Sequence, residues 1–163
     1  MMNKRQALSF GSFLVLALVI MSLIMYFLNA GIVLNTASKI FNGNYAREYR
    51  GWDIIFGLKE GDNQLIAAST WGIIGIVTLV LGGIAVLFRP LDRFRFLLSF
   101  LLLLASSIIT FLLPRIAHIS TLDWGDLIKI EPGLGIPLII ALILQIIAAL
   151  ISIYLFTINE DEQ

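Results

Sequence analysis

The sequence predicts an all-α membrane protein in which four transmembrane helices form one bundle, with a small β or helical cap built from two loops. Hydrophobic residues make up 59% of the 163 residues and charged residues only 13%, with a mean hydropathy of +0.95. A soluble domain carries about 25% charged residues and would expose much of this apolar surface to water. The second observation is that four apolar stretches are long enough to cross a bilayer.

These four stretches define the expected spans. A helix needs about 20 apolar residues to cross roughly 30 Å of hydrocarbon, and a charge at the bilayer centre costs several kcal/mol. Apart from Arg95 at the start of the third stretch, none contains a charged residue or a histidine. The first stretch exceeds the apolar core of about 7–15 residues in a signal peptide, so we interpret it as a retained span. One domain covers 1–163, with spans at 9–28, 67–88, 94–113 and 135–156.

The connections between spans predict their topology. The runs are continuously apolar, whereas strands of a membrane barrel alternate in polarity. The connector 89–93 is so short that the second and third helices form an antiparallel hairpin. Basic residues concentrate in short cytoplasmic segments: Lys4, Arg5, Arg89, Arg93 and Arg95 lie in such segments, whereas the other basic residues are spread over the loops 29–66 and 114–134. We expect a multi-pass protein of the cell membrane with both termini in the cytoplasm.

The two long loops predict a cap on the outer side. Asn42-Gly43 lies between apolar and aromatic neighbours, a signal for a two-residue type I′ hairpin turn. Asp53 is a candidate N-cap of a short helix, with Trp52 at the membrane interface. The second loop is long enough to cover the first, and the two together could form a short sheet. The candidate residues for contact with a partner are Tyr49, Arg50, Trp52, Asp53, Phe56 and Trp124.

Uncharged polar residues lie near the middle of the predicted spans. They are Thr78, Ser106, Ser107 and Gln145. An amide facing lipid would leave strong donors and acceptors without partners, so we expect Gln145 to turn inward and bond a neighbouring hydroxyl. Such a bond would fix helix packing. The alternative is a site for a polar substrate or for water.

Small and aromatic residues add two further expectations. Glycines of the second span fall on one side at helical spacing: Gly72, Gly75, Gly82 and Gly83. Small residues let helices approach closely in lipid, and packing within the chain is favoured over a dimer seam. Tyr26, Trp71 and Tyr154 lie near span ends, where an aromatic belt is expected.

Several function classes lose support. The chain has no cysteine, which excludes disulfides, thiol nucleophiles and iron–sulfur clusters. The formal net charge is zero, so nothing favours nucleic acid as a partner. No nucleotide-binding or hydrolase motif is present. The isolated His118, with Asp123 and Asp126, is interpreted as loop surface. We expect no cofactor, no metal and no catalytic residue.

Two resemblances bear on topology. Four helices, a larger first outer loop with an aromatic–glycine segment and a tight cytoplasmic turn resemble claudin-like membrane proteins. The chain departs from that family because it lacks the paired cysteines of the first loop, so no claudin residue role transfers. The segment Gly51–Gly57, Gly-Trp-Asp-Ile-Ile-Phe-Gly, is similar to a motif in small four-helix membrane proteins of low-GC Gram-positive bacteria. This resemblance implies a bacterial cell membrane.

Three functions follow from these patterns. The leading hypothesis is a non-enzymatic protein that acts through contacts, either as an accessory or assembly subunit of a membrane complex or as a scaffold, bound to a membrane-protein partner or to itself. The second is a small oligomeric channel or facilitator, in which several copies, or one copy with a partner, line a path with Thr78, Ser106, Ser107 and Gln145. The third is an enzyme acting on lipid through His118, Asp123 and Asp126.

Overall fold

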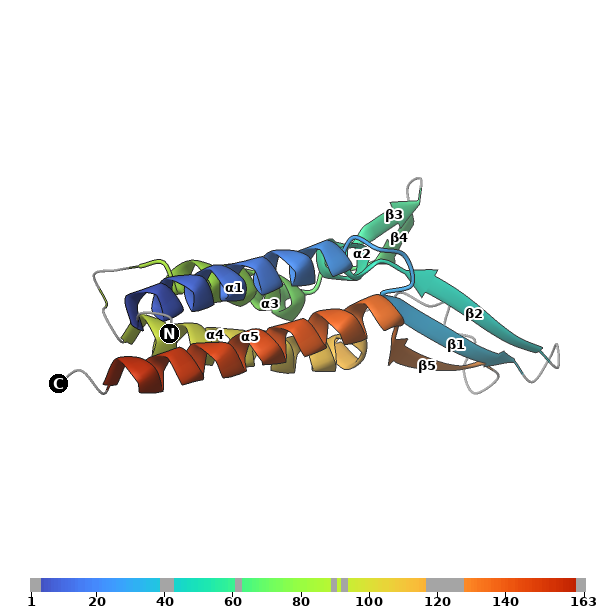
Figure 1. Ribbon diagram of the computed structural model, residues 1–163. Coiled ribbons are helices and arrows are strands. Elements are labelled where there is room, and N and C mark those ends of the chain that lie inside the picture. The colour runs from blue at the N-terminus through green and yellow to red at the C-terminus, as the bar shows by residue number, and fades with distance from the viewer. Residues whose placement is uncertain are drawn as a thin grey trace.

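The computed structural model consists of apolar helices that run side by side, with β-strands gathered at one end (Figure 1). It describes residues 4–38, 43–60, 63–88, 91, 94–116 and 128–160. The long helices are α1 (Lys4–Met25), α3 (Thr70–Ala85), α4 (Phe94–Ile116) and α5 (Ile136–Glu160). Both chain ends lie at the end of the bundle opposite the strands (Figure 1).

Three of these helices are long and apolar enough to cross a membrane: Gln6–Met25, Phe94–Ile116 and Ile136–Ile158. The second predicted span is shorter than expected, because helix α3 covers only Thr70–Ala85 instead of 67–88. Ser69, which has an extended backbone, is the N-cap of α3. Its side chain accepts a hydrogen bond from the backbone N–H of Gly72. At the other end the chain tightens into a turn, in which the N–H of Phe88 bonds the carbonyl of Ala85 at 3.1 Å.

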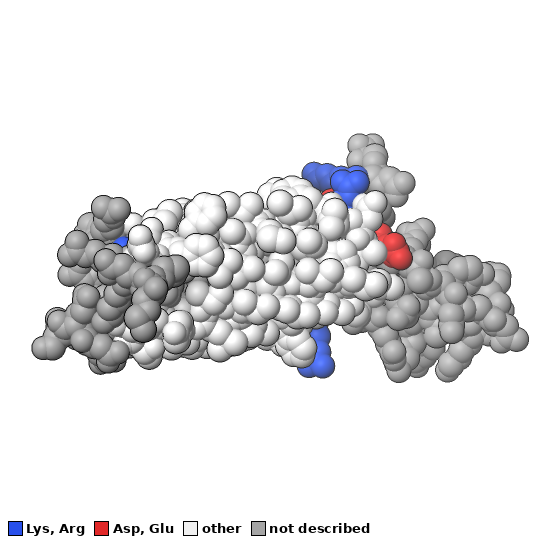
Figure 2. Space-filling view, viewed as in Figure 1, with Lys and Arg blue, Asp and Glu red and all other residues white. Residues whose placement is uncertain are grey.

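The outer surface of the bundle is apolar. Large side chains point outward along every long helix, including Phe13 with 68% exposure, Phe111 with 57% and Leu150 with 59%. On the face that Figure 2 shows, the described residues over the middle of the helices carry no charged atom, and the coloured atoms lie toward the ends of the helices. Several polar side chains are instead buried between the helices, among them Ser22, Ser99, Ser106, Thr110, Gln145 and Ser152. This arrangement of apolar outside and polar inside is the one that helices in lipid adopt.

The predicted glycine face of α3 lies inside the chain's own fold. A Cβ added to Gly75 would lie 2.8 Å from Ile109 on α4, and one added to Gly83 would lie 2.9 Å from Val19 on α1. Gly72 and Gly82 are equally close to Ile55 and Leu103, respectively. All four glycines are therefore buried against neighbouring elements of this chain.

Strands from both long loops form one antiparallel sheet in the order β2-β1-β5. They are β1 (Ile32–Ser38), β2 (Gly43–Tyr49) and β5 (Ile128–Leu134). Gly43 pairs with Ser38, so the connection is the four residues 39–42. The two-residue turn predicted at Asn42-Gly43 is thus wrong, because Gly43 already belongs to the strand ladder. A second hairpin pairs β3 (Leu58–Glu60) with β4 (Asn63–Ile66).

A tight junction joins this sheet to the bundle. Ala30 has a φ of 62° just before β1, and the N–H of Gly135 donates to the carbonyl of Gly31 at 2.7 Å. A Cβ on Gly135 would overlap the carbonyl oxygen of Ala30, so only glycine fits there.

The short helix α2 (Gly51–Phe56) lies beside this junction. The N–H of Trp52 donates to the carbonyl of Tyr26 at 2.9 Å, which attaches α2 to the end of α1. The prediction that Asp53 is the N-cap is wrong. The helix begins at Gly51, and Arg50 occupies the capping position. Asp53 instead lies in the first turn, where a negative charge is favourable toward the helix dipole.

Candidate functional site

A closed ring of hydrogen bonds lies between α4, α5 and the turn that follows α1. The Tyr26 hydroxyl and Thr110 Oγ1 are 2.6 Å apart, and Thr110 Oγ1 donates to Gln145 Oε1 at 3.1 Å. Gln145 Nε2 closes the ring by donating to the Tyr26 hydroxyl at 3.2 Å. Gln145 has no exposed surface, and Tyr26 and Thr110 each retain only 2%. The ring therefore joins α4 and α5 to the turn that follows α1 through side chains alone.

Neighbouring groups form further hydrogen bonds with the members of this ring. The second hydrogen of Gln145 Nε2 is donated to Ser22 Oγ at 3.0 Å, and Ser22 donates to the carbonyl of Ala141 at 3.3 Å. Thr110 also lies 2.9 Å from the carbonyl of Ser106. The amide of Gln145 thus has a partner for its oxygen and for both hydrogens. Each polar atom of this amide therefore has a partner within the chain.

Other buried hydroxyls join the helices in the same way. Ser106 donates to the carbonyl of Gly75 at 2.9 Å, and Ser99 donates to the carbonyl of Gly82 at 2.7 Å. Both bonds join α4 to α3, where the glycines let the backbones approach. Ser99 and Ser152 are 3.2 Å apart and join α4 to α5. In lipid such bonds are worth about 0.6 kcal/mol each.

The predicted midplane residues do not come together as one site. Thr78 donates to carbonyls of its own helix at Ile74 and Gly75, and Ser107 donates to Leu104 on its own helix. Only Gln145 enters the ring, and it faces other side chains, as expected. Ser106 borders the ring through its carbonyl.

Sequence reasoning missed three members of this cluster: Ser22, Tyr26 and Thr110. The prediction that Tyr26 belongs to the aromatic belt is wrong, because its hydroxyl lies inside the bundle. A usable signal was the spacing of polar residues by one helical turn: Ser22 and Tyr26 are four apart, and so are Ser106 and Thr110. Residues four apart share one helix face, so each pair marks an inward face.

The second candidate site is an aromatic cluster at the end of the bundle, made of Phe27, Trp52 and Phe56. The ring centroids of Phe27 and Trp52 are 4.5 Å apart, and those of Trp52 and Phe56 are 4.1 Å apart. Phe27 is 52% exposed and Phe56 42%. Next to the cluster, Arg50 donates to Asn29 Oδ1 at 2.9 Å and is itself exposed. The three rings therefore form a partly exposed aromatic surface, and Arg50 lies two residues before Trp52 in the chain.

The remaining predicted cap residues have different environments. Tyr49 packs against the hydrophobic core, and Asp53 is half-buried. Trp124 lies outside the described residues, and so do the loop residues His118, Asp123 and Asp126. Within the described part of the chain, no group of three or more metal-ligating side chains could hold an ion.

Comparison with known proteins adds no family: no protein-family model, curated protein or solved structure matches this chain.

Proposed function

We propose that this chain is a non-enzymatic membrane protein that acts through protein contacts, as an accessory or assembly subunit or a scaffold of a membrane complex. The observation that carries the proposal is a contrast between the buried hydrogen-bonded ring and the exposed aromatic cluster. The interior ring is closed on itself by hydrogen bonds, whereas the aromatic cluster beside Arg50 lies at the surface. Tryptophan and arginine are enriched among the residues that dominate protein interfaces.

The proposal includes four membrane spans with claudin-like topology, in a bacterial cell membrane, with both termini in the cytoplasm. A helix of the length of Thr70–Ala85 rises about 24 Å, less than the roughly 30 Å of hydrocarbon. The apolar turn that continues to Phe88 extends this distance. Because α3 packs along α4, which is long enough to span, both helices would cross together. The sheet would then lie on the outer side.

A channel or facilitator is the weaker candidate. It would need Thr78, Ser106, Ser107 and Gln145 to line a common path, but Thr78 and Ser107 bond their own helices while Gln145 bonds other side chains. A path through one copy would have to break the ring. Flux through proteoliposomes that contain the purified chain would favour this alternative.

Site-specific photo-crosslinking in the native membrane tests the contact function. A photoreactive phenylalanine analogue replaces Phe56, and the matched control carries it at Tyr154, which is 63% exposed on α5 at the other end. We expect a discrete crosslinked product from position 56, identified by mass spectrometry as a second protein or a second copy, and only diffuse lipid adducts from position 154. Lipid adducts alone at both positions, together with purification of a lone monomer in mild detergent, would refute the proposal.

A further inference from the structure

Tyr26 belongs both to the buried ring and to the attachment of the aromatic cluster. Its hydroxyl lies 2.6 Å from Thr110 Oγ1 and accepts a hydrogen bond from Gln145 Nε2 at 3.2 Å. Its carbonyl accepts a hydrogen bond at 2.9 Å from the N–H of Trp52, whose ring contacts both other rings of the cluster. One buried residue therefore bonds the interior of the bundle with its side chain and the cap with its backbone.

The turn around Tyr26 joins its position to that of the neighbouring aromatic residue. The N–H of Tyr26 donates to the carbonyl of Leu23 at 3.1 Å, and the N–H of Phe27 donates to the carbonyl of Ile24 at 3.0 Å. Phe27 in turn stacks on Trp52. A shift of the Tyr26 backbone would therefore displace a second ring of the cluster as well.

The aromatic ring of Tyr26 also packs against the first residue of α2. A Cβ added to Gly51 would lie 3.0 Å from Cδ1 of Tyr26 and 3.0 Å from Cδ2 of Leu138 on α5. Gly51 is buried, so the start of α2 lies against this side chain and against α5 with no room for a larger residue. The position of α2 therefore depends on where the hydrogen-bonded ring holds Tyr26.

The far end of α2 is attached to α3. The N–H of Ser69 donates to the carbonyl of Ile55 at 2.9 Å, and a Cβ added to Gly72 would lie 2.9 Å from Cγ1 of Ile55. A helix of six residues is too short to be stable by itself. The order of α2 therefore depends on its attachments, and the attachment at Tyr26 is the one that bonds Trp52 directly.

We propose that Tyr26 is a positioning residue, through which the buried ring holds α2 and the aromatic cluster in one arrangement. While the ring is closed, the cluster is a preformed surface, and a preformed surface lowers the entropy cost of binding. An open ring would release Tyr26, and the three aromatic side chains would lose their common arrangement. The control of partner contact by the ring rests on the proposed function, whereas the coupling of ring and cluster is a property of the chain alone.

Hydrogen exchange of the full chain in mild detergent, followed by mass spectrometry, tests this coupling. Tyr26→Phe removes one hydroxyl from the ring but keeps the aromatic side chain against Gly51 and the carbonyl that bonds Trp52. Gln145→Leu opens the ring from another helix. We expect the amides of α2 to exchange at least about fivefold faster in both variants, although neither changes a residue of α2 or of the cluster.

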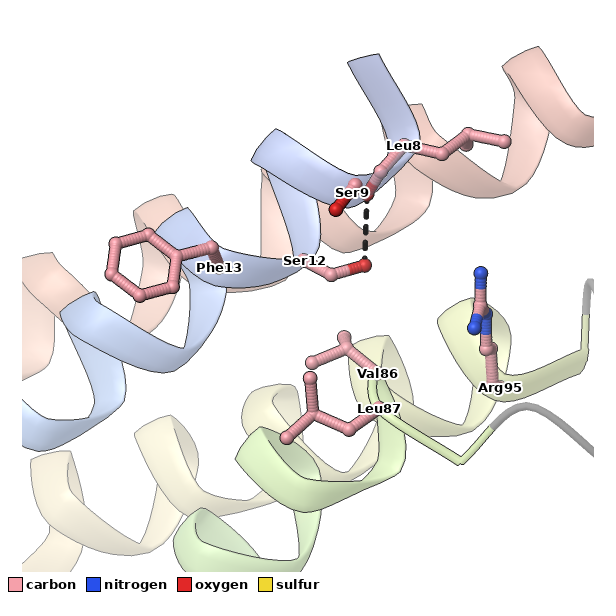
Figure 3. A pocket seen from close by; sticks show the side chains of 7 residues that line it. All are labelled: Leu8, Ser9, Ser12, Phe13, Val86, Leu87 and Arg95. Carbon is pink, nitrogen blue, oxygen red and sulfur yellow. Dashed lines mark hydrogen bonds between the residues drawn. The ribbon is translucent and has the colours of Figure 1, made fainter. Parts of the chain in front are cut away.

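Two control variants remove hydroxyls that lie outside the ring. Ser99→Ala removes hydrogen bonds to the carbonyl of Gly82 and to Ser152, so it reports the effect of losing bonds between helices elsewhere. Ser12 lies on α1 at a partly open cavity of about 370 Å³, where it donates to the carbonyl of Leu8 at 2.9 Å (Figure 3). In Ser99→Ala and Ser12→Ala, exchange in α2 should stay within about twofold of the wild type.

Unchanged exchange of α2 in Tyr26→Phe, or the same acceleration in Ser99→Ala, would overturn the coupling. Tyr26→Phe nearly conserves side-chain volume, so it decides the matter if Gln145→Leu does not fold. The result is also distinguishable from that of the crosslinking experiment at Phe56. Lipid adducts alone in that experiment would refute the contact function without touching the coupling, whereas unchanged exchange in α2 would refute the coupling alone.

Discussion

Replacing Gln145 by leucine tests whether the buried ring holds the helices together. The change removes three hydrogen bonds: those to Ser22 and Tyr26 and the one from Thr110. Interhelical bonds in a membrane average about 0.6 kcal/mol each, so the expected loss is about 2 kcal/mol, or roughly 30-fold in the folding equilibrium constant. The loss is not larger because each hydroxyl keeps another partner; Ser22, for example, still reaches the carbonyl of Ala141.

Equilibrium unfolding in mixed micelles, followed by far-ultraviolet circular dichroism, measures this loss. Two controls match the substitution. Ile146→Leu changes a lipid-facing neighbour with 43% exposure, and Thr78→Val removes a hydroxyl that bonds only its own helix. Both should stay within about 0.5 kcal/mol of the wild type. Combining Gln145→Leu with Tyr26→Phe should give a coupling energy of about 0.6–1.7 kcal/mol. A Gln145→Leu variant as stable as these controls, with additive effects in the double variant, would refute a structural role for the ring.

Three further substitutions test the junctions of the cap. Gly135→Ala should lower the free energy of unfolding by more than about 2 kcal/mol, because the added Cβ would overlap the Ala30 carbonyl. Gly133→Ala is the control and should be neutral, because the atom nearest to its added Cβ is 3.9 Å away. The yield of folded protein on size exclusion distinguishes the two variants. Gly57→Ala places a side chain at a φ of 88° and should lower the free energy of unfolding by about 1–3 kcal/mol. This loss would appear as a lower unfolding midpoint, and an unchanged midpoint would contradict the backbone geometry. Trp52→Leu removes two aromatic contacts worth about 0.5–1.5 kcal/mol each and should speed amide hydrogen exchange in α2 without affecting α5; equal exchange rates in α2 would exclude a stabilising role for the stack.

The sequence predicted the structure correctly where a lipid environment leaves a residue few alternative positions. The apolar runs identified the long helices, since a charge-free stretch of that length has few other places to lie. The inward orientation of Gln145 followed from the cost of an amide in hydrocarbon. The short α3 was not predictable in this way, because residues 67–69 are as apolar or small as the helix that follows. Only the hydrogen bond from Gly72 to Ser69 shows where that helix begins.

Contacts between distant parts of the chain could not be predicted from the sequence. The composition of the loops suggested a sheet, but nothing local shows that Ile32 pairs with Leu134. An aromatic residue at a span end is equally suited to the interface and to the interior, so the burial of Tyr26 depends on Thr110 and Gln145, on two other helices. The exposed cluster around Trp52 likewise requires Phe27 from the preceding helix end.

The sheet order β2-β1-β5 has a consequence for how the protein is made. Strands β1 and β2 are neighbours in the chain, whereas β5 is made only after α3 and α4, so the other edge of β1 has no partner in this chain until β5 has been synthesised. A partner about 100 residues away closes late, because long loops form slowly. The bond between Gly135 and Gly31 forms at the same stage. Until β5 has been made, β1 has an unpaired edge, and an unpaired strand edge is a template for a chaperone or for mispairing with another copy.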